Sequence, residues 1–138
     1  MSKVLFVCKQ NAGRSQISDA LFARAASARH ESRSAGTRPA EHVHPVVAEA
    51  MREISIDISG NRPQKFTDDL AQWADVVVTM GCGDECPYIP GKKYIDWDLI
   101  DPADKPLAEV RAIRDDIRHR VADLVVELDS RRAVSSAS

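Results

Sequence analysis

The sequence lacks a long hydrophobic run and an excess of basic charge, and both absences exclude classes of protein. No stretch approaches the roughly 18 apolar residues that a membrane-spanning helix needs, and the apolar part of residues 1–8 is too short for the core of a signal peptide. The 19 Lys and Arg residues are balanced by 21 Asp and Glu residues, for a formal net charge of −2. This balance argues against a surface that binds nucleic acid or anionic membranes. We therefore expect a cytoplasmic protein that binds neither.

Cysteine is also scarce. The chain has 3 cysteines, an odd number that does not fit the fully paired disulfide framework of a small secreted domain. In a reducing compartment such cysteines are candidates for catalysis, redox chemistry or metal binding. The length of 138 residues suits one compact domain, and 43% apolar residues are enough for an ordinary core.

Strand and helix patterns alternate along the chain. Continuous apolar runs are typical of strands that are buried on both faces, and apolar residues spaced by three or four indicate amphipathic helices. Strands are predicted at residues 3–8, 30–34, 74–80 and 93–97, and helices at 15–28, 45–54, 67–73 and 107–128.

Such alternation predicts an α/β domain with a parallel sheet covered by helices on both faces. We expect this single domain to span residues 1–130 and a flexible tail to follow at 131–138.

The clearest candidate site is the CX5RS segment that starts at Cys8, between the first predicted strand and helix. Ligands of such sheets bind at the carboxyl ends of strands, and loop N–H groups with a helix N-terminus favour an oxyanion. The side chain of Arg14 suits two oxygens of that anion, and Ser15 is placed to donate to a nucleophilic thiolate at Cys8. The expected oxyanion-binding residues are Lys9, Gln10, Asn11, Ala12, Gly13 and Arg14. The alternative is a buried structural cysteine beside two solvated residues.

A second candidate is the pair Asp101 and Pro102 in a long irregular segment. Displacement at a tetrahedral oxyanion needs an acid that protonates the departing oxygen, and a carboxyl on a loop above the site meets that need. Alternatively, the pair only starts a turn before the last helix. Taken together with the Cys8 segment, the acid is the favoured interpretation.

The other two cysteines form a CX3C segment, Cys82 and Cys86, after the second buried strand. In a parallel sheet this segment leaves at the same edge as Cys8, so the three thiols could converge. A disulfide needs Cα atoms within about 7 Å, which an intervening turn or loop allows. The pair is therefore a candidate redox switch, and two unpaired loop thiols are the alternative.

The histidines do not complete a metal site with these cysteines. CX3C resembles half of a zinc site, but His42 and His44 lie far away in the sequence. We expect no metal and no cofactor. His30 and His119 are expected to be surface or helix residues without a role.

Taken together, these segments resemble the arsenate reductases built on the low-molecular-weight protein tyrosine phosphatase fold. The resemblance runs over about residues 3–128 and implies a four-stranded parallel sheet with helices on both sides. The Cys8 loop and the Asp-Pro pair resemble the whole superfamily, whereas the later cysteine pair resembles the thioredoxin-coupled reductases. The matching segments are residues 3–15, 34–36, 74–80, 82–84, 101–102 and the closing amphipathic helix.

The resemblance also implies a reaction. Cys8 attacks arsenate, whose oxygens are held by the loop amides and Arg14, and Asp101 protonates the leaving oxygen. Cys82 then attacks the sulfur of Cys8, which releases arsenite, and Cys86 displaces Cys8 to leave a Cys82–Cys86 disulfide that thioredoxin reduces. The reduction takes two electrons, which one disulfide supplies. Phosphate and sulfate are expected to compete with arsenate.

Three other functions stay open at this point. A phosphotyrosine phosphatase needs only Cys8, Arg14 and Asp101, but phosphatases of this fold usually carry aromatic residues where this sequence has Ala103 and Asp104. A reductase that uses mycothiol or glutathione would not need the later cysteine pair. A sensor that captures arsenite with three thiols would bind without turnover.

Overall fold

Four parallel strands form one sheet in the part of the chain that the computed structural model describes, residues 1–81, 88 and 90–137. Their order is β2-β1-β3-β4. The register sets Cys8 opposite Gly36, Val7 opposite Thr79, and Thr79 opposite Asp96. The strands are β1 Lys3–Cys8, β2 Glu31–Gly36, β3 Val76–Thr79 and β4 Lys93–Asp96.

Local sequence explains where several of the helices begin and end. Pro45 occupies the first turn of its helix, where its missing N–H costs nothing. The side chain of Thr67 accepts a hydrogen bond from the N–H of Leu70 at 3.2 Å and caps another helix. Ser27, in the left-handed conformation, ends the first. The helices are α1 Arg14–Ala26, α2 Pro45–Arg52, α3 Asp68–Trp73 and α4 Leu107–Ala137.

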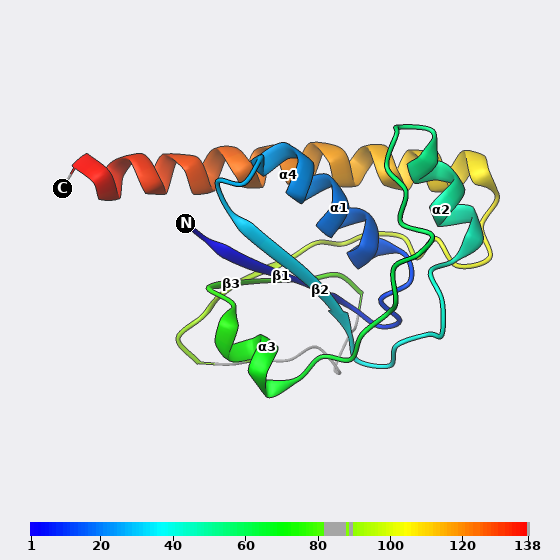
Figure 1. The fold of residues 1–138 in the computed structure, drawn as a ribbon, viewed down its shortest axis with the longest axis horizontal. Coiled ribbons are helices and arrows are strands. Elements are labelled where there is room, and N and C mark those ends of the chain that lie inside the picture. The colour runs from blue at the N-terminus through cyan, green and yellow to red at the C-terminus, as the bar shows by residue number, and fades with distance from the viewer. Residues whose placement is uncertain (82–87, 89, 138) are drawn as a thin grey trace.

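The helices cover the two faces of the sheet unequally. Helices α1, α2 and α4 lie on one face and the short α3 on the other (Figure 1). Because side chains of a strand alternate between faces, Phe6 of β1 packs under the first group while Leu5 and Val7 pack toward α3. The predicted α/β fold class is therefore confirmed.

Most element boundaries differ from the expected ones by one or two residues, and two differences concern the sheet edge and the chain end. Strand β2 extends to Gly36, because Ala35 and Gly36 pair with the end of β1. The backbone of residues 131–137 continues α4, beyond the boundary that we expected at residue 130.

His30 is buried, with 4% of its surface exposed, so the expectation of a surface or helix position was wrong. The N–H of Ser2 donates to its Nδ1 at 3.1 Å, and its Nε2 lies 2.9 Å from a carboxylate oxygen of Asp129. The residue lies just before β2, where α4 passes over the sheet.

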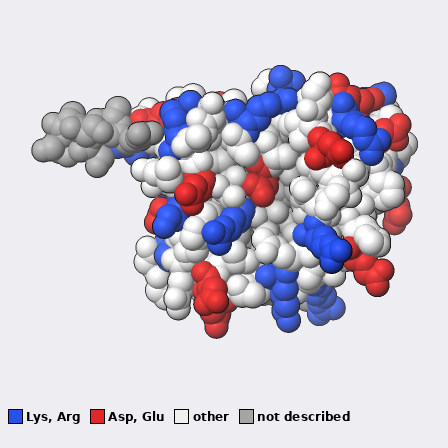
Figure 2. Space-filling view, viewed as in Figure 1, with Lys and Arg blue, Asp and Glu red and all other residues white. Residues whose placement is uncertain are grey.

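The surface agrees with the near-neutral composition. Basic and acidic side chains are interspersed over the face that Figure 2 shows. No helix among the described residues is long and apolar enough for a bilayer crossing.

Candidate active site

Cys8 ends β1 at the carboxyl edge of the sheet and is almost fully buried. Two donors approach its sulfur: the N–H of Asn11 at 3.2 Å and the hydroxyl of Ser15 at 2.9 Å. Asn11 has φ of 51°, a left-handed conformation that Asn tolerates better than most residues. This reversal turns its N–H back toward Cys8.

In the loop between β1 and α1, residues 8–14 (the Cys8 loop), the backbone carbonyls of residues 8–13 each accept a hydrogen bond. The segment 37–44 donates to four of them, the side chain of Gln16 to a fifth, and the N–H of Ile17 to the last. The pairs are Cys8 with Thr37, Lys9 with Arg38, Gln10 with Ala40, Asn11 with Gln16, Ala12 with His44, and Gly13 with Ile17.

In a trans peptide the N–H points opposite to the carbonyl of the preceding residue. Because the carbonyls of residues 8–13 face partners around the Cys8 loop, the N–H groups of residues 9–14 turn to its other side, where that of Asn11 meets the sulfur of Cys8. Successive inward N–H groups followed by a helix N-terminus form an anion-binding concavity. The backbone N–H groups of the predicted oxyanion-binding residues, 9–14, thus lie on the same side of the Cys8 loop.

The hydrogen bonds around Asn11 have a fixed direction. The backbone N–H of Gln64 donates to Oδ1 of Asn11 at 2.9 Å, so the amide nitrogen of Asn11 faces Ser15, to which it donates at 2.7 Å. The hydroxyl oxygen of Ser15 therefore accepts from Asn11, and when Cys8 is a thiolate, which has no proton to give, the proton of Ser15 is donated to its sulfur. The thiolate of Cys8 therefore accepts hydrogen bonds from both Asn11 and Ser15.

Arg14 lies beside the Cys8 loop with 8% of its side chain exposed. It donates to the carbonyl of Leu99 at 3.3 Å, and its other terminal nitrogen lies 3.5 Å from a carboxylate oxygen of Asp101. Gly81 has φ of 79°, and a Cβ there would stand 2.0 Å from the guanidinium. The backbone after β3 therefore lies directly on Arg14.

The segment that carries Asp101 crosses above the start of α1. A Cβ on Gly13 would stand 2.7 Å from the ring of Pro102, which shows how closely the two segments approach. The Asp101 side chain is about half exposed and accepts from the N–H of Ala103 at 3.0 Å. The structure thus brings the predicted acid together with Cys8, Arg14 and Ser15 at one edge of the sheet.

The other two predicted site residues, Cys82 and Cys86, lie outside the described residues. Their segment follows Gly81, which lies against the guanidinium of Arg14.

Sequence reasoning missed the residues that support the Cys8 loop from outside. Gln16 and Gln64 donate to Asn11, and Gly36 has no room for a side chain, because a Cβ there would stand 2.6 Å from the carbonyl oxygen of Lys9. A glycine at a strand end was the available signal for close backbone approach.

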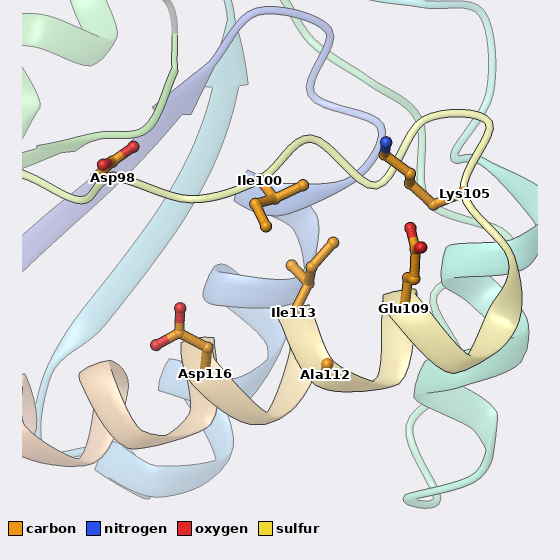
Figure 3. Close-up of a pocket in the computed structure, with 7 residues that line it drawn as sticks. All are labelled: Asp98, Ile100, Lys105, Glu109, Ala112, Ile113 and Asp116. Carbon is orange, nitrogen blue, oxygen red and sulfur yellow. The ribbon is translucent and has the colours of Figure 1, made fainter.

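A cavity of about 500 Å³ lies on another side of the Asp101 segment, between residues 98–105 and the first turns of α4 (Figure 3). Ile100 and Ile113 point toward one another across it. Its rim has three carboxylates and one Lys, which does not suit an anion, so it is not the predicted oxyanion site. The lining residues are Asp98, Ile100, Lys105, Glu109, Ala112, Ile113 and Asp116.

Metal ligands do not gather in the described part of the chain. Among those residues, no group of three or more His, Cys, Asp or Glu side chains could hold a metal ion.

Comparison with known proteins agrees with the geometry. The family model of the low molecular weight phosphotyrosine protein phosphatases matches residues 3–134. A Halobacterium salinarum protein, provisionally named arsenate reductase, is 41% identical, with 93% of this chain and 94% of that protein covered. The glutaredoxin arsenate reductase of Synechocystis is 33% identical, with 93% and 99% covered.

Among solved structures, the thioredoxin-dependent arsenate reductase of Corynebacterium glutamicum superposes with a TM-score of 0.79 at 41% identity. The match covers 94% of this chain but 62% of that one, so this chain spans less than two thirds of the Corynebacterium protein. The resemblance inferred from the sequence is confirmed: the chain belongs to the low molecular weight phosphotyrosine protein phosphatase family, in its arsenate reductase branch.

Proposed function

We propose that this protein reduces arsenate to arsenite with Cys8 as the nucleophile. The observation that carries the proposal is the orientation of the Cys8 loop: its carbonyls bond outward, and its N–H groups turn to the side of a sulfur that already accepts two hydrogen bonds. Such a concavity binds a tetrahedral oxyanion next to the sulfur. The arsenate reductase names of the relatives support arsenic as the reacting centre.

In the first step the sulfur of Cys8 forms a bond to arsenic, and one arsenate oxygen departs. Asp101 supplies the proton that lets this oxygen leave as water. Arg14 holds two of the remaining oxygens with its planar fork. The contact between Arg14 and Asp101 at 3.5 Å supports the placement of both groups over one anion.

In the second step Cys82 attacks the sulfur of Cys8. A sulfur–sulfur bond forms, the sulfur–arsenic bond breaks, and its electron pair stays on arsenic, which leaves as arsenite. Cys86 then attacks Cys82, and Cys8 departs as a thiolate. A dithiol protein reduces the resulting Cys82–Cys86 disulfide, so two thiols of the donor supply both electrons.

The identity of the donor is part of the proposal. We propose a thioredoxin, because the Corynebacterium relative at 41% identity is named thioredoxin-dependent. The Synechocystis relative is named a glutaredoxin arsenate reductase, which makes a glutaredoxin system the comparison to include. Recycling by either system needs a reducing compartment, in agreement with the expected cytoplasmic location.

The test is arsenate-dependent NADPH oxidation with thioredoxin and thioredoxin reductase. The wild type should turn over repeatedly, and Cys8→Ser, Cys82→Ser and Cys86→Ser should each abolish multiple turnover. Cys86→Ser should retain one turnover, because only the last exchange is blocked. One equivalent of arsenate should remove two of the 3 thiols.

Different failures would point to different errors. No arsenite from the wild type with any donor would refute the reductase. Full activity of Cys82→Ser with mycothiol or glutathione would refute the cysteine cascade while leaving Cys8 as the nucleophile.

A weak phosphatase activity toward small phosphate esters is the second candidate. The family model carries the phosphatase name, and phosphate has the same shape and charge as arsenate. Ala103 and Asp104 follow the Asp-Pro pair, so no aromatic ring stands there to stack on phosphotyrosine. Hydrolysis of p-nitrophenyl phosphate, lost in Cys8→Ser, would test this activity.

A further inference from the structure

We propose that Gln16 is a positioning residue for the nucleophile: its carboxamide holds Asn11 in the conformation that aims donors at Cys8. The inference concerns the same site as the proposed function. Its main measurement, the reactivity of one thiol, does not depend on whether arsenate is the substrate.

Gln16 is the third residue of α1 and is 4% exposed. Its Nε2 lies 3.1 Å from the backbone oxygen of Asn11 and 3.3 Å from Oδ1 of the same residue. Its Oε1 accepts from the side-chain nitrogen of Asn61 at 3.1 Å. Every polar atom of the Gln16 carboxamide is thus engaged inside the protein.

The neighbours of the Gln16 carboxamide fix which of its two ends is the nitrogen and which is the oxygen. The backbone oxygen of Asn11 is an acceptor, and its Oδ1 faces the backbone N–H of Gln64, which is a donor. The group of Gln16 that faces both oxygens must therefore be its NH₂. The side chain donates toward Asn11, Asn11 toward Ser15, and Ser15 toward the sulfur of Cys8.

Asn11 is the residue on which both donors of the sulfur depend. Its own N–H is one of them, and its side chain orients the other, the hydroxyl of Ser15. It is fully buried and left-handed, with φ of 51°, and its carbonyl accepts from the side chain of Gln16, whereas the other carbonyls of residues 8–13 accept from backbone N–H groups. Without the Gln16 donor this carbonyl would be buried without a partner, which favours its reorientation.

The test measures alkylation of Cys8 by iodoacetamide, followed by the mass of the Cys8 peptide. Gln16→Met keeps the length of the side chain and removes the donor, and loss of one such buried bond should slow alkylation at neutral pH about fivefold. Gln16→Glu should slow it further, because an oxygen then faces the two oxygens of Asn11. The pH profile of alkylation should move toward higher pH in both variants.

The matched control is Leu21→Val, which trims a buried side chain of the same helix, one turn further from the Cys8 loop, that takes no part in these bonds. It should lower stability while leaving the rate and pH profile of Cys8 alkylation unchanged. If Cys8 is alkylated at the same rate in Gln16→Met as in Leu21→Val, the proposal is wrong.

A second variant changes an exposed residue, whose substitution is compatible with folding, so the rate of Cys8 alkylation can be compared in a folded protein. Asn61 is exposed, and Asn61→Ala removes the bond that fixes the outer end of Gln16. Alkylation of Cys8 should slow by about twofold, and Ser59→Ala in the same segment should have no effect. Unchanged reactivity in Asn61→Ala would count against the chain of bonds even if both Gln16 variants fail to fold. A wild type with reactive Cys8 but no arsenate turnover would refute the proposed function alone.

Discussion

Strand β1 has a polar cluster at each end, and the two clusters differ in function. At its amino end the N–H of Ser2 donates to Nδ1 of His30, so Nδ1 is an acceptor and Nε2 is the ring nitrogen that can donate. Nε2 of His30 donates a hydrogen bond to a carboxylate oxygen of Asp129 at 2.9 Å. At the carboxyl end the N–H of Asn11 and the hydroxyl of Ser15 converge on the sulfur of Cys8.

The difference is the balance of donors and acceptors. At the amino end both ring nitrogens of His30 are matched one to one by the protein. At the carboxyl end, the six N–H groups of residues 9–14 and the guanidinium of Arg14 have three acceptors among the described residues, namely the sulfur of Cys8, the carbonyl of Leu99 and the carboxylate of Asp101. A surplus of donors is what an anion requires. Buried polar groups alone therefore do not identify the site, whereas the surplus does.

Among substitutions that keep the three cysteines, the largest effect should come from Asp101→Asn. If Asp101 is the acid, the variant loses the proton that the leaving oxygen needs, and turnover should fall about a hundredfold. Stability should hardly change, because the Asp101 carboxylate is half exposed and a solvent-accessible partner at 3.5 Å contributes about 1 kcal/mol or less. Steady-state arsenate reduction and urea unfolding measure the two quantities.

The matched control is Asp104→Asn, a carboxylate in the same segment whose left-handed φ of 59° an Asn tolerates. It should keep full activity. Equal losses in the two variants would mean that the charge of the segment matters and that Asp101 has no special part.

A smaller effect is expected from Gly36→Ala, which tests how tightly the carboxyl end is built. The new methyl would stand 2.6 Å from the carbonyl oxygen of Lys9 and 2.9 Å from the nitrogen of Asn11, so the Cys8 loop must shift. Such overpacking should lower the free energy of unfolding by about 1–3 kcal/mol. Phosphate binding, measured by calorimetry, should weaken because the loop N–H groups move with it.

Gly60→Ala is the control for Gly36→Ala, since nothing lies within 4 Å of the added Cβ. Stability should be unchanged or rise slightly, by about 0.4–1 kcal/mol, through the unfolded chain. Unaltered phosphate binding in Gly36→Ala would show that the close approach of β2 does not shape the anion site.

The part of the site that follows from local spacing could be predicted from the sequence. Cys8, Arg14 and Ser15 are set by one strand end, one loop and one helix start, and the apolar runs of β1 and β3 show where the strands lie. The order of a parallel sheet then brings Gly81 to the same edge.

The rest depends on contacts between distant segments that leave no periodic signal. Gln64 reaches Asn11 across 53 positions, and Asp129 reaches His30 across 99. A single buried histidine between a helix and a polar strand carries no pattern that separates it from a surface residue. Its burial follows only from the path of α4 over the sheet.

The smallest effect tests the amino end, where stability should change and activity should not. The hydrogen bond from Arg29, followed by that from His30, lowers the pKa of the Asp129 carboxyl below its ordinary value of 3.8. A lowered pKa means that the folded state favours the carboxylate, so its contribution is present above pH 3.8 and is lost as pH falls through the folded pKa. Asp129→Asn should therefore be less stable than the wild type at neutral pH, and the difference should shrink in acid.

Urea unfolding across this pH range measures the difference, with Asp123→Asn as the control, because Asp123 is an exposed carboxylate of the same helix. Arsenate turnover of Asp129→Asn at neutral pH should equal that of the wild type, since its contacts lie at the opposite end of β1 from Cys8. A loss of turnover in this variant, with its fold intact, would mean that the two ends of β1 are coupled. The arrangement of donors at the carboxyl end would then depend on the hydrogen bonds of His30 with Ser2 and Asp129 at the amino end.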